Sequence, residues 1–132
     1  MLQFSSHLSA AQKNCLTDVI DKSHWGYSSQ SRAEMPKVAE VAATQLGSRR
    51  TAFIFVFEAD GWCGTAGCPV LIGELHGGIC RLLYDGMGDK SFTVLDQRDH
   101  GYRRIYAPCE ARFDGHEYQQ VREECPNPDV HH

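Results

Sequence analysis

The sequence lacks several features that would assign it to a large class of protein. No stretch of about 18 apolar residues occurs, so we expect no membrane-spanning helix. Positive charge is not in excess, because 13 lysines and arginines face 17 acidic residues, and a net charge of −4 disfavours nucleic acid as a partner. The N-terminus lacks the pattern of a signal peptide, but such signals are removed on export, so we expect one to be already lost.

Local signatures of catalysis are missing as well. There is no glycine-rich phosphate loop, no nucleophile elbow and no pair of carboxylates at a recognisable spacing, so we expect neither an enzyme nor a cofactor. The seven histidines are scattered, and none has the i,i+4 spacing of a helical zinc pair. Four acidic residues around two glycine-containing loops are candidates for a calcium site: Asp85, Asp89, Asp96 and Asp99. They lack the ligand spacing of an EF-hand loop. We therefore expect no metal site.

What the sequence does contain is an ordinary globular composition with many cysteines. With 42% hydrophobic and 23% charged residues, the chain should fold, and its length predicts one domain over residues 1–132. An even number of cysteines in a short chain favours a disulfide framework in an oxidising compartment, over a zinc site or free thiols. The six are Cys15, Cys63, Cys68, Cys80, Cys109 and Cys125.

The segment DGWCGTAGCPVLI contains the two cysteines that are nearest in sequence, Cys63 and Cys68. Gly64 and Gly67 permit a tight reversal, which can bring the two Cα atoms within disulfide range. A disulfide clamp therefore fits better than a zinc knuckle or a reactive thiol. The other four cysteines allow three pairings, among which we predict Cys80–Cys109 and Cys15–Cys125.

The first 50 residues are predicted to form two helices. Ser9 to Gln12 is typical of a capping box, and apolar positions at helical spacing follow, so the first helix should run from Ser9 to Lys22. The glycine- and serine-rich segment from residue 23 to 31 should be a loop. Pro36 at a first-turn position, an apolar stripe and then Gly47 predict a second helix between them.

The remainder is predicted to be β-structure. The unbroken apolar run TAFIFVFEA, residues 51–59, is typical of a central strand covered on both faces. A hairpin is indicated around His76 to Gly78. The predicted fold is α+β, with two N-terminal helices packed on one face of an antiparallel sheet of about five or six strands, stapled by disulfides. The other predicted strands cover residues 70–75, 79–84, 92–95, 102–107 and 110–113.

Three segments together resemble a group of small exported bacterial envelope proteins with a CG(S/T)(G/A)GC motif. They are CGTAGCPVLI at residues 63–72, GYRRI at 101–105 and RFDGHEY at 112–118, in the order and approximate spacing of the group. Arg104 stands where the group usually has aspartate. Some chains of this size and layout resemble immunity proteins of type VI secretion amidase effectors. The resemblance implies a Cys63–Cys68 disulfide, a periplasmic location and no catalytic residues.

The leading hypothesis is a periplasmic immunity protein that binds a peptidoglycan amidase effector and occludes its active site. Partner contacts are expected at three residues: Trp62 beside the bridge, Met87 between two glycines, and Asp89. The other loop tryptophan, Trp25, lacks a neighbouring bridge. The assembly expected is a homodimer or a heterotetramer with the effector. Two alternatives remain, a periplasmic lysozyme inhibitor that uses Arg98, Arg103 and Arg104, and a cysteine-dependent enzyme.

Overall fold

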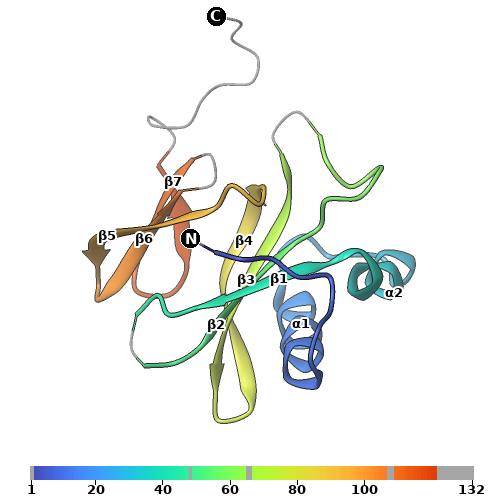
Figure 1. The fold of residues 1–132 in the computed structure, drawn as a ribbon, viewed down its shortest axis with the longest axis horizontal. Helices are drawn as coiled ribbons and strands as arrows, with labels where there is room; N and C mark the ends of the chain where they lie inside the picture. The colour runs from blue at the N-terminus through green and yellow to red at the C-terminus, as the bar shows by residue number, and fades with distance from the viewer. Residues whose placement is uncertain (1, 48, 65–66, 107–108, 122–132) are drawn as a thin grey trace, which may run out of the picture.

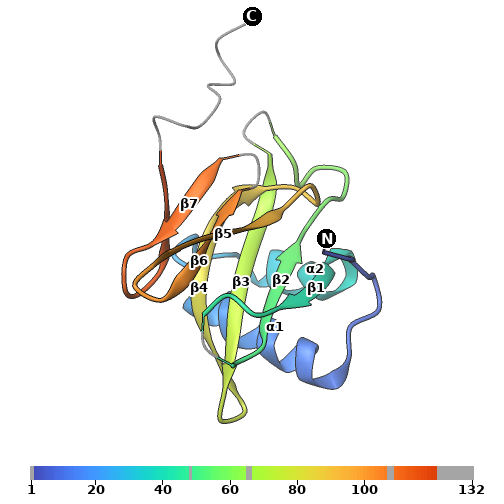
Figure 2. The same ribbon diagram turned by 60° about the vertical axis from the view of Figure 1, so that its left-hand side comes forward.

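The protein consists of two helices and two antiparallel sheets, arranged in three layers (Figures 1 and 2). The computed structural model describes residues 2–47, 49–64, 67–106 and 109–121. The first sheet has the strand order β1-β2-β3-β4 and the second the order β5-β6-β7-β8. The elements are α1 (Ala10–Lys22), α2 (Ser29–Val38), β1 (Glu40–Thr44), β2 (Ala52–Val56), β3 (Cys68–His76), β4 (Ile79–Gly88), β5 (Thr93–Asp99), β6 (Tyr102–Tyr106), β7 (Glu110–Phe113) and β8 (Tyr118–Gln120).

The first sheet is the central layer, with the helices on one face and the second sheet on the other (Figure 1). Its strand β2 is buried throughout and alternates between two cores. Ile54 and Val56 pack in the cluster between the sheets, whereas Phe53 and Phe55 pack in the cluster beneath the helices. The expectation of a central strand covered on both faces is therefore confirmed.

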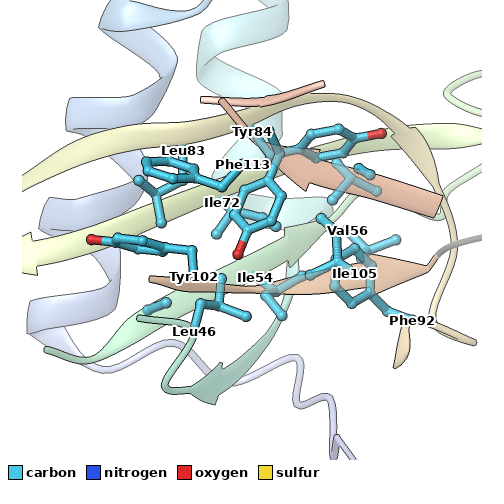
Figure 3. Packing of buried hydrophobic residues seen from close by; sticks show 14 of the residues in the cluster. Leu46, Ile54, Val56, Ile72, Leu83, Tyr84, Phe92, Tyr102, Ile105 and Phe113 are labelled. Carbon is cyan, nitrogen blue, oxygen red and sulfur yellow. The ribbon is translucent and has the colours of Figure 1, made fainter. Parts of the chain in front are cut away.

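The core between the sheets is built from both layers, as Figure 3 shows. Ile72 and Tyr84 contribute from the first sheet, and Ile105 and Phe113 from the second. The two sheets bury their facing apolar side chains against each other, which is the main driving force for holding them together.

Helix α1 is fixed against the edge strand β4 by covalent and polar contacts. The expected capping box is present, since Ser9 accepts a hydrogen bond from the Gln12 backbone and the Gln12 side chain accepts one from the Ser9 backbone. One turn further on, Cys15 forms a disulfide with Cys80. The expected first helix is thus confirmed, with Ser9 as its N-cap.

The structure corrects three expectations. The strands form two four-stranded sheets rather than one sheet of five or six, because the chain leaves β4 and starts a second sheet instead of adding to the first. The second helix is α2, which ends at Val38, and residues 40–44 pair with β2 as strand β1. The Cys15–Cys80 bond excludes both predicted pairings that used these two cysteines. Cys109 is disulfide-bonded, and Cys125 lies outside the described residues.

Candidate functional site

The three residues predicted to bind a partner belong to two segments, which lie at the same end of the first sheet. Cys68 pairs with Gly88, and Pro69 with Met87, so the start of β3 lies beside the end of β4. Trp62 precedes the first of these strands and Asp89 follows the second. We call this region, residues 58–64, 67–69 and 87–91, the disulfide end.

The Cys63–Cys68 bridge closes a short turn at the disulfide end, as the sequence predicts. The Cα atoms of the two cysteines are 4.1 Å apart, and Gly64 and Gly67 exchange two backbone hydrogen bonds of 2.8 and 3.1 Å. Gly67 has φ of +113°, and a Cβ there would lie 3.0 Å from the carbonyl oxygen of Gly88. Glycine is therefore required for the turn to pack against the end of β4.

Trp62 is half-buried rather than fully presented to solvent. Its ring stacks on Phe57, with centroids 6.0 Å apart and an interplanar angle of 29°. It also packs against the core beneath the helices. Part of the indole therefore stabilises the fold, and only the remaining part is available to a partner.

Met87 and Asp89 lie in different local structures. Met87 lies in strand β4 rather than in a loop, and its carbonyl oxygen accepts a hydrogen bond of 3.1 Å from the Tyr84 hydroxyl. Its side chain is half-buried. Asp89 caps the following turn, since its Oδ1 accepts from the Ser91 amide at 2.8 Å and from the Ser91 hydroxyl.

Acidic side chains surround a single lysine at the disulfide end. The ammonium of Lys90 lies 2.9 Å from Glu40 and 3.4 Å from Glu58. The hydrogen bond with Glu40 is the main cause that raises the pKa of Lys90 above its usual value. With Asp60 and Asp89 also present, carboxylates outnumber this one ammonium, and the region favours a cationic or hydrogen-bond-donating partner group.

The second tryptophan, Trp25, is not among the residues predicted to bind a partner, yet it is the more exposed of the two. Its residue surface is 59% exposed, whereas most large apolar side chains in the described ranges are covered. The loop that carries it, residues 23–28 between α1 and α2, is held in place by Asp85. The Oδ2 atom of Asp85 accepts hydrogen bonds from the Ser23 hydroxyl at 2.8 Å and the His24 amide at 2.7 Å.

A second contact links the Trp25 loop to the second sheet. The Nε2 atom of His24 lies 3.1 Å from each carboxylate oxygen of Glu117, which precedes β8. This hydrogen bond is the largest cause that raises the pKa of His24 above 6.5. Asp85 and Met87 are two residues apart on one strand and so face the same side of the sheet. The Trp25 loop therefore lies on the same face as Met87.

The acidic residues considered as calcium ligands are engaged elsewhere. Asp85 binds the Trp25 loop, Asp96 pairs with Arg103 at 3.2 Å, and Asp99 pairs with Arg104 at 2.9 Å. Among the residues that the structure describes, no group of three or more histidine, cysteine or acidic side chains is arranged to hold a metal ion.

Residues behind the two alternative hypotheses are also engaged internally. Arg103 donates to the carbonyl oxygen of Leu95 at 2.8 Å, and Arg98 donates to that of Gly101 at 2.9 Å. All described cysteines are in disulfides, so within residues 2–121, gaps aside, no thiol is available as a nucleophile.

A groove of about 730 Å³ lies between the N-terminal segment, β1 and β5. Trp62, Met87 and Asp89 do not line it, whereas Arg103, one of the three arginines named for a lysozyme inhibitor, does. Its lining is mixed, with both apolar and hydrogen-bonding side chains, among them Leu2, Gln3, Ala43, Phe92, Val94 and Arg103.

Comparison of the sequence with protein-family models, with curated proteins and with solved structures gave no match. In the described part of the chain, neither helix has the length and apolar character needed to cross a membrane. The disulfides are typical of an oxidising compartment outside the cytoplasm.

Proposed function

We propose that the protein is a periplasmic immunity protein that binds a peptidoglycan amidase effector of type VI secretion and blocks its active-site cleft. The observation that carries the proposal is that two segments distant in sequence meet at the disulfide end, one with Trp62 and the other with Met87 and Asp89. The resemblance of residues 63–72, 101–105 and 112–118 to small exported envelope proteins points to the same class.

Pre-organisation supports an inhibitory role for this end. The bridge and the paired glycines fix the backbone next to Trp62, and Tyr84 fixes the backbone at Met87. A partner that binds these residues does not have to order them first, so less of the interaction energy is lost on association. Tryptophan is enriched among the anchor residues of interfaces, and methionine adapts to irregular pockets.

The charge of the disulfide end fits an enzyme with a cysteine–histidine site. Asp89 precedes Lys90, whose ammonium lies between Glu40 and Glu58, and an imidazole of such a site can donate a hydrogen bond to a carboxylate of this region. The proposed partner is a protein, and the proposed contact uses no cofactor and no metal.

The test is to measure inhibition of purified cysteine–histidine peptidoglycan amidases by the protein, using release of soluble fragments from isolated cell walls. We expect at least one amidase to be inhibited at a ratio of one chain to one enzyme, in contrast to a lysozyme assayed in parallel. Met87→Ala and Asp89→Ala should weaken the complex by about tenfold or more, because each removes an anchor side chain.

The matched control is Lys13→Ala, an exposed residue on α1 away from this end. It should leave inhibition unchanged. If an amidase is inhibited equally well by wild type, Met87→Ala and Asp89→Ala, the disulfide end is not the interface. If no amidase is inhibited but lysozyme is, the proposed function is wrong.

A further inference from the structure

The opposite end of the first sheet contains a carboxylate that is completely buried. Glu74 has 0% of its surface exposed, and both of its oxygens accept the Tyr102 hydroxyl, at 2.7 and 2.9 Å. The Nε of Arg81 donates to the same carboxylate at 3.3 Å. A buried charge is tolerated only when it is paired and hydrogen-bonded, and this one is both.

Arg81 is held in a defined orientation by this arrangement. Its Nη2 donates to the Tyr102 hydroxyl at 2.8 Å, and its guanidinium carbon lies 5.7 Å and 5.8 Å from the ring centres of Tyr102 and Phe113. Those two rings stack with centroids 4.1 Å apart. The Arg81 side chain is nevertheless 43% exposed, so part of a fixed guanidinium faces solvent.

A second arginine is brought to the same carboxylate by the turn between β1 and β2. Arg50 Nη1 lies 4.0 Å from Glu74, and the Arg50 side chain is 43% exposed. The turn can approach because Gly47 packs on the Tyr102 ring, where a Cβ would lie 2.6 Å from ring atoms. Any larger residue at this position would push the turn, and with it Arg50, away from Glu74.

Positive charge therefore gathers at this end, although the chain as a whole carries −4. Arg49 is exposed beside Arg50 in the chain, and Arg98 donates to the carbonyl oxygen of Leu46 in the same turn. Glu74 compensates only one of the four arginines. We call Arg49, Arg50, Arg81 and Arg98 the arginine end.

We propose that the arginine end is a second binding site, which takes adjacent carboxylates of an acidic segment of a partner protein. The planar fork of a guanidinium matches a carboxylate in two parallel hydrogen bonds, and Arg81 is already oriented for this by Glu74 and the two rings. The site lies away from the disulfide end, because Glu74 pairs with Arg81 near the hairpin whereas Cys68 pairs with Gly88. It is thus independent of the amidase contact.

The proposal is tested by titrating the ¹⁵N-labelled protein with a capped pentaglutamate peptide and following backbone amide shifts by NMR. We expect saturable shifts centred on Gly47, Arg81 and Tyr102, and a dissociation constant that rises with salt because the contact is ionic. Arg50→Gln should weaken binding by about tenfold, and Arg50→Lys by less, because lysine keeps the charge but loses the fork. Arg50 is chosen because its only described ion pair is long and its loss should leave the fold intact.

Three controls define the results that would contradict the proposed acidic-peptide site. Lys13→Gln removes the same charge from α1 and should leave binding unchanged; an equal loss with Arg50→Gln would show non-specific attraction. Capped pentaglutamine should not bind. Inorganic phosphate that binds as tightly as the peptide at the same amides would reduce the site to a general anion site, and absence of saturable shifts with pentaglutamate would overturn the proposal outright.

Discussion

Cys15 in α1 is bonded to Cys80 in β4, with Cα atoms 5.1 Å apart. The backbone of Cys80 is bound by the same helix, since its N–H donates to Asp18 at 2.9 Å and its carbonyl oxygen accepts from Lys22 at 2.6 Å. An edge strand normally exposes such groups to other chains. Here α1 covers them, so the disulfide fixes a helix that also protects the edge of the first sheet.

The two described disulfides should differ in their contributions to stability. Replacing Cys15 and Cys80 by alanine opens a link with a sequence separation of 65 residues, and the loop-entropy model gives a loss of about 4 kcal/mol in the free energy of unfolding. For Cys63 and Cys68, separated by five residues, the same model gives about 2 kcal/mol. Urea unfolding followed by circular dichroism measures both. The reverse order would show that the short bridge, not the long one, dominates stability.

The hydroxyl of Tyr102 should contribute measurably to stability. Tyr102→Phe removes the donor to both oxygens of buried Glu74, and a lost hydrogen bond to a charged group costs about 1.5 to 3 kcal/mol. Tyr106→Phe is the matched control, because that side chain is exposed and should tolerate the change. Unfolding curves of the two variants give the comparison. Equal stabilities would mean that Arg81 alone satisfies the carboxylate.

Binding of His24 to Glu117 predicts a pH dependence of the Trp25 loop. The pKa of His24 is raised above 6.5 in the folded state, so the added stability is full below about pH 6.5 and is lost as pH rises through the folded pKa. The effect on global stability should be small, because the imidazole is 69% exposed. Glu117→Gln should lower the pKa of His24, as followed by NMR of the ring protons.

Glu34→Gln is the control for that titration, because Glu34 is exposed on α2 and is not among the groups that shift His24. It should leave the pKa of His24 unchanged. A His24 pKa that stays equally high in Glu117→Gln would assign the shift to other charges, and the loop would then not be held by this contact.

Local signals predicted α1, β2 and the short bridge, because each depends on residues close together in sequence. The Ser9–Gln12 capping box marks where α1 begins, and glycines beside Cys63 and Cys68 permit their bond. Disulfide pairing between cysteines far apart in the sequence could not be predicted. Nothing near Cys15 in the sequence indicates Cys80 as its partner, and of the three possible pairings the predicted one, Cys80–Cys109 with Cys15–Cys125, is wrong.

The predicted bounds of the second helix were wrong for a related reason. The alanine-rich run after Val38 has good helix propensity, but Val41 pairs with Phe55 of β2, and this tertiary pairing overrides the local preference. Pro36 lies near the end of α2 rather than at its start, since the N-cap is Ser28. In the candidate site, the neighbouring bridge identified Trp62 from the sequence. Solvent exposure depends on the tertiary structure, however, and Trp25 is more exposed than Trp62.

Trp25 should therefore be the clearer anchor of the two tryptophans in binding to an amidase. Its loop is fixed by Asp85 and Glu117 before any partner arrives, and its indole is largely uncovered. Trp25→Ala should change the free energy of unfolding by no more than about 0.5 kcal/mol, as for an exposed residue, yet weaken the complex by about thirtyfold. Trp62→Ala should instead destabilise the fold by about 1 to 3 kcal/mol, because it removes the ring stacked on Phe57.

Calorimetric titration of the inhibited amidase with each variant, alongside urea unfolding, separates the two roles. The control is Ile79→Ala, since Ile79 is 60% exposed at the β3–β4 hairpin, away from the disulfide end, and should alter neither property. Wild-type affinity in Trp25→Ala, together with a loss in Met87→Ala, would confine the interface to the disulfide end. The exposed indole would then have no part in that complex, and the contact between His24 and Glu117 would serve only to hold α1 and β8 together.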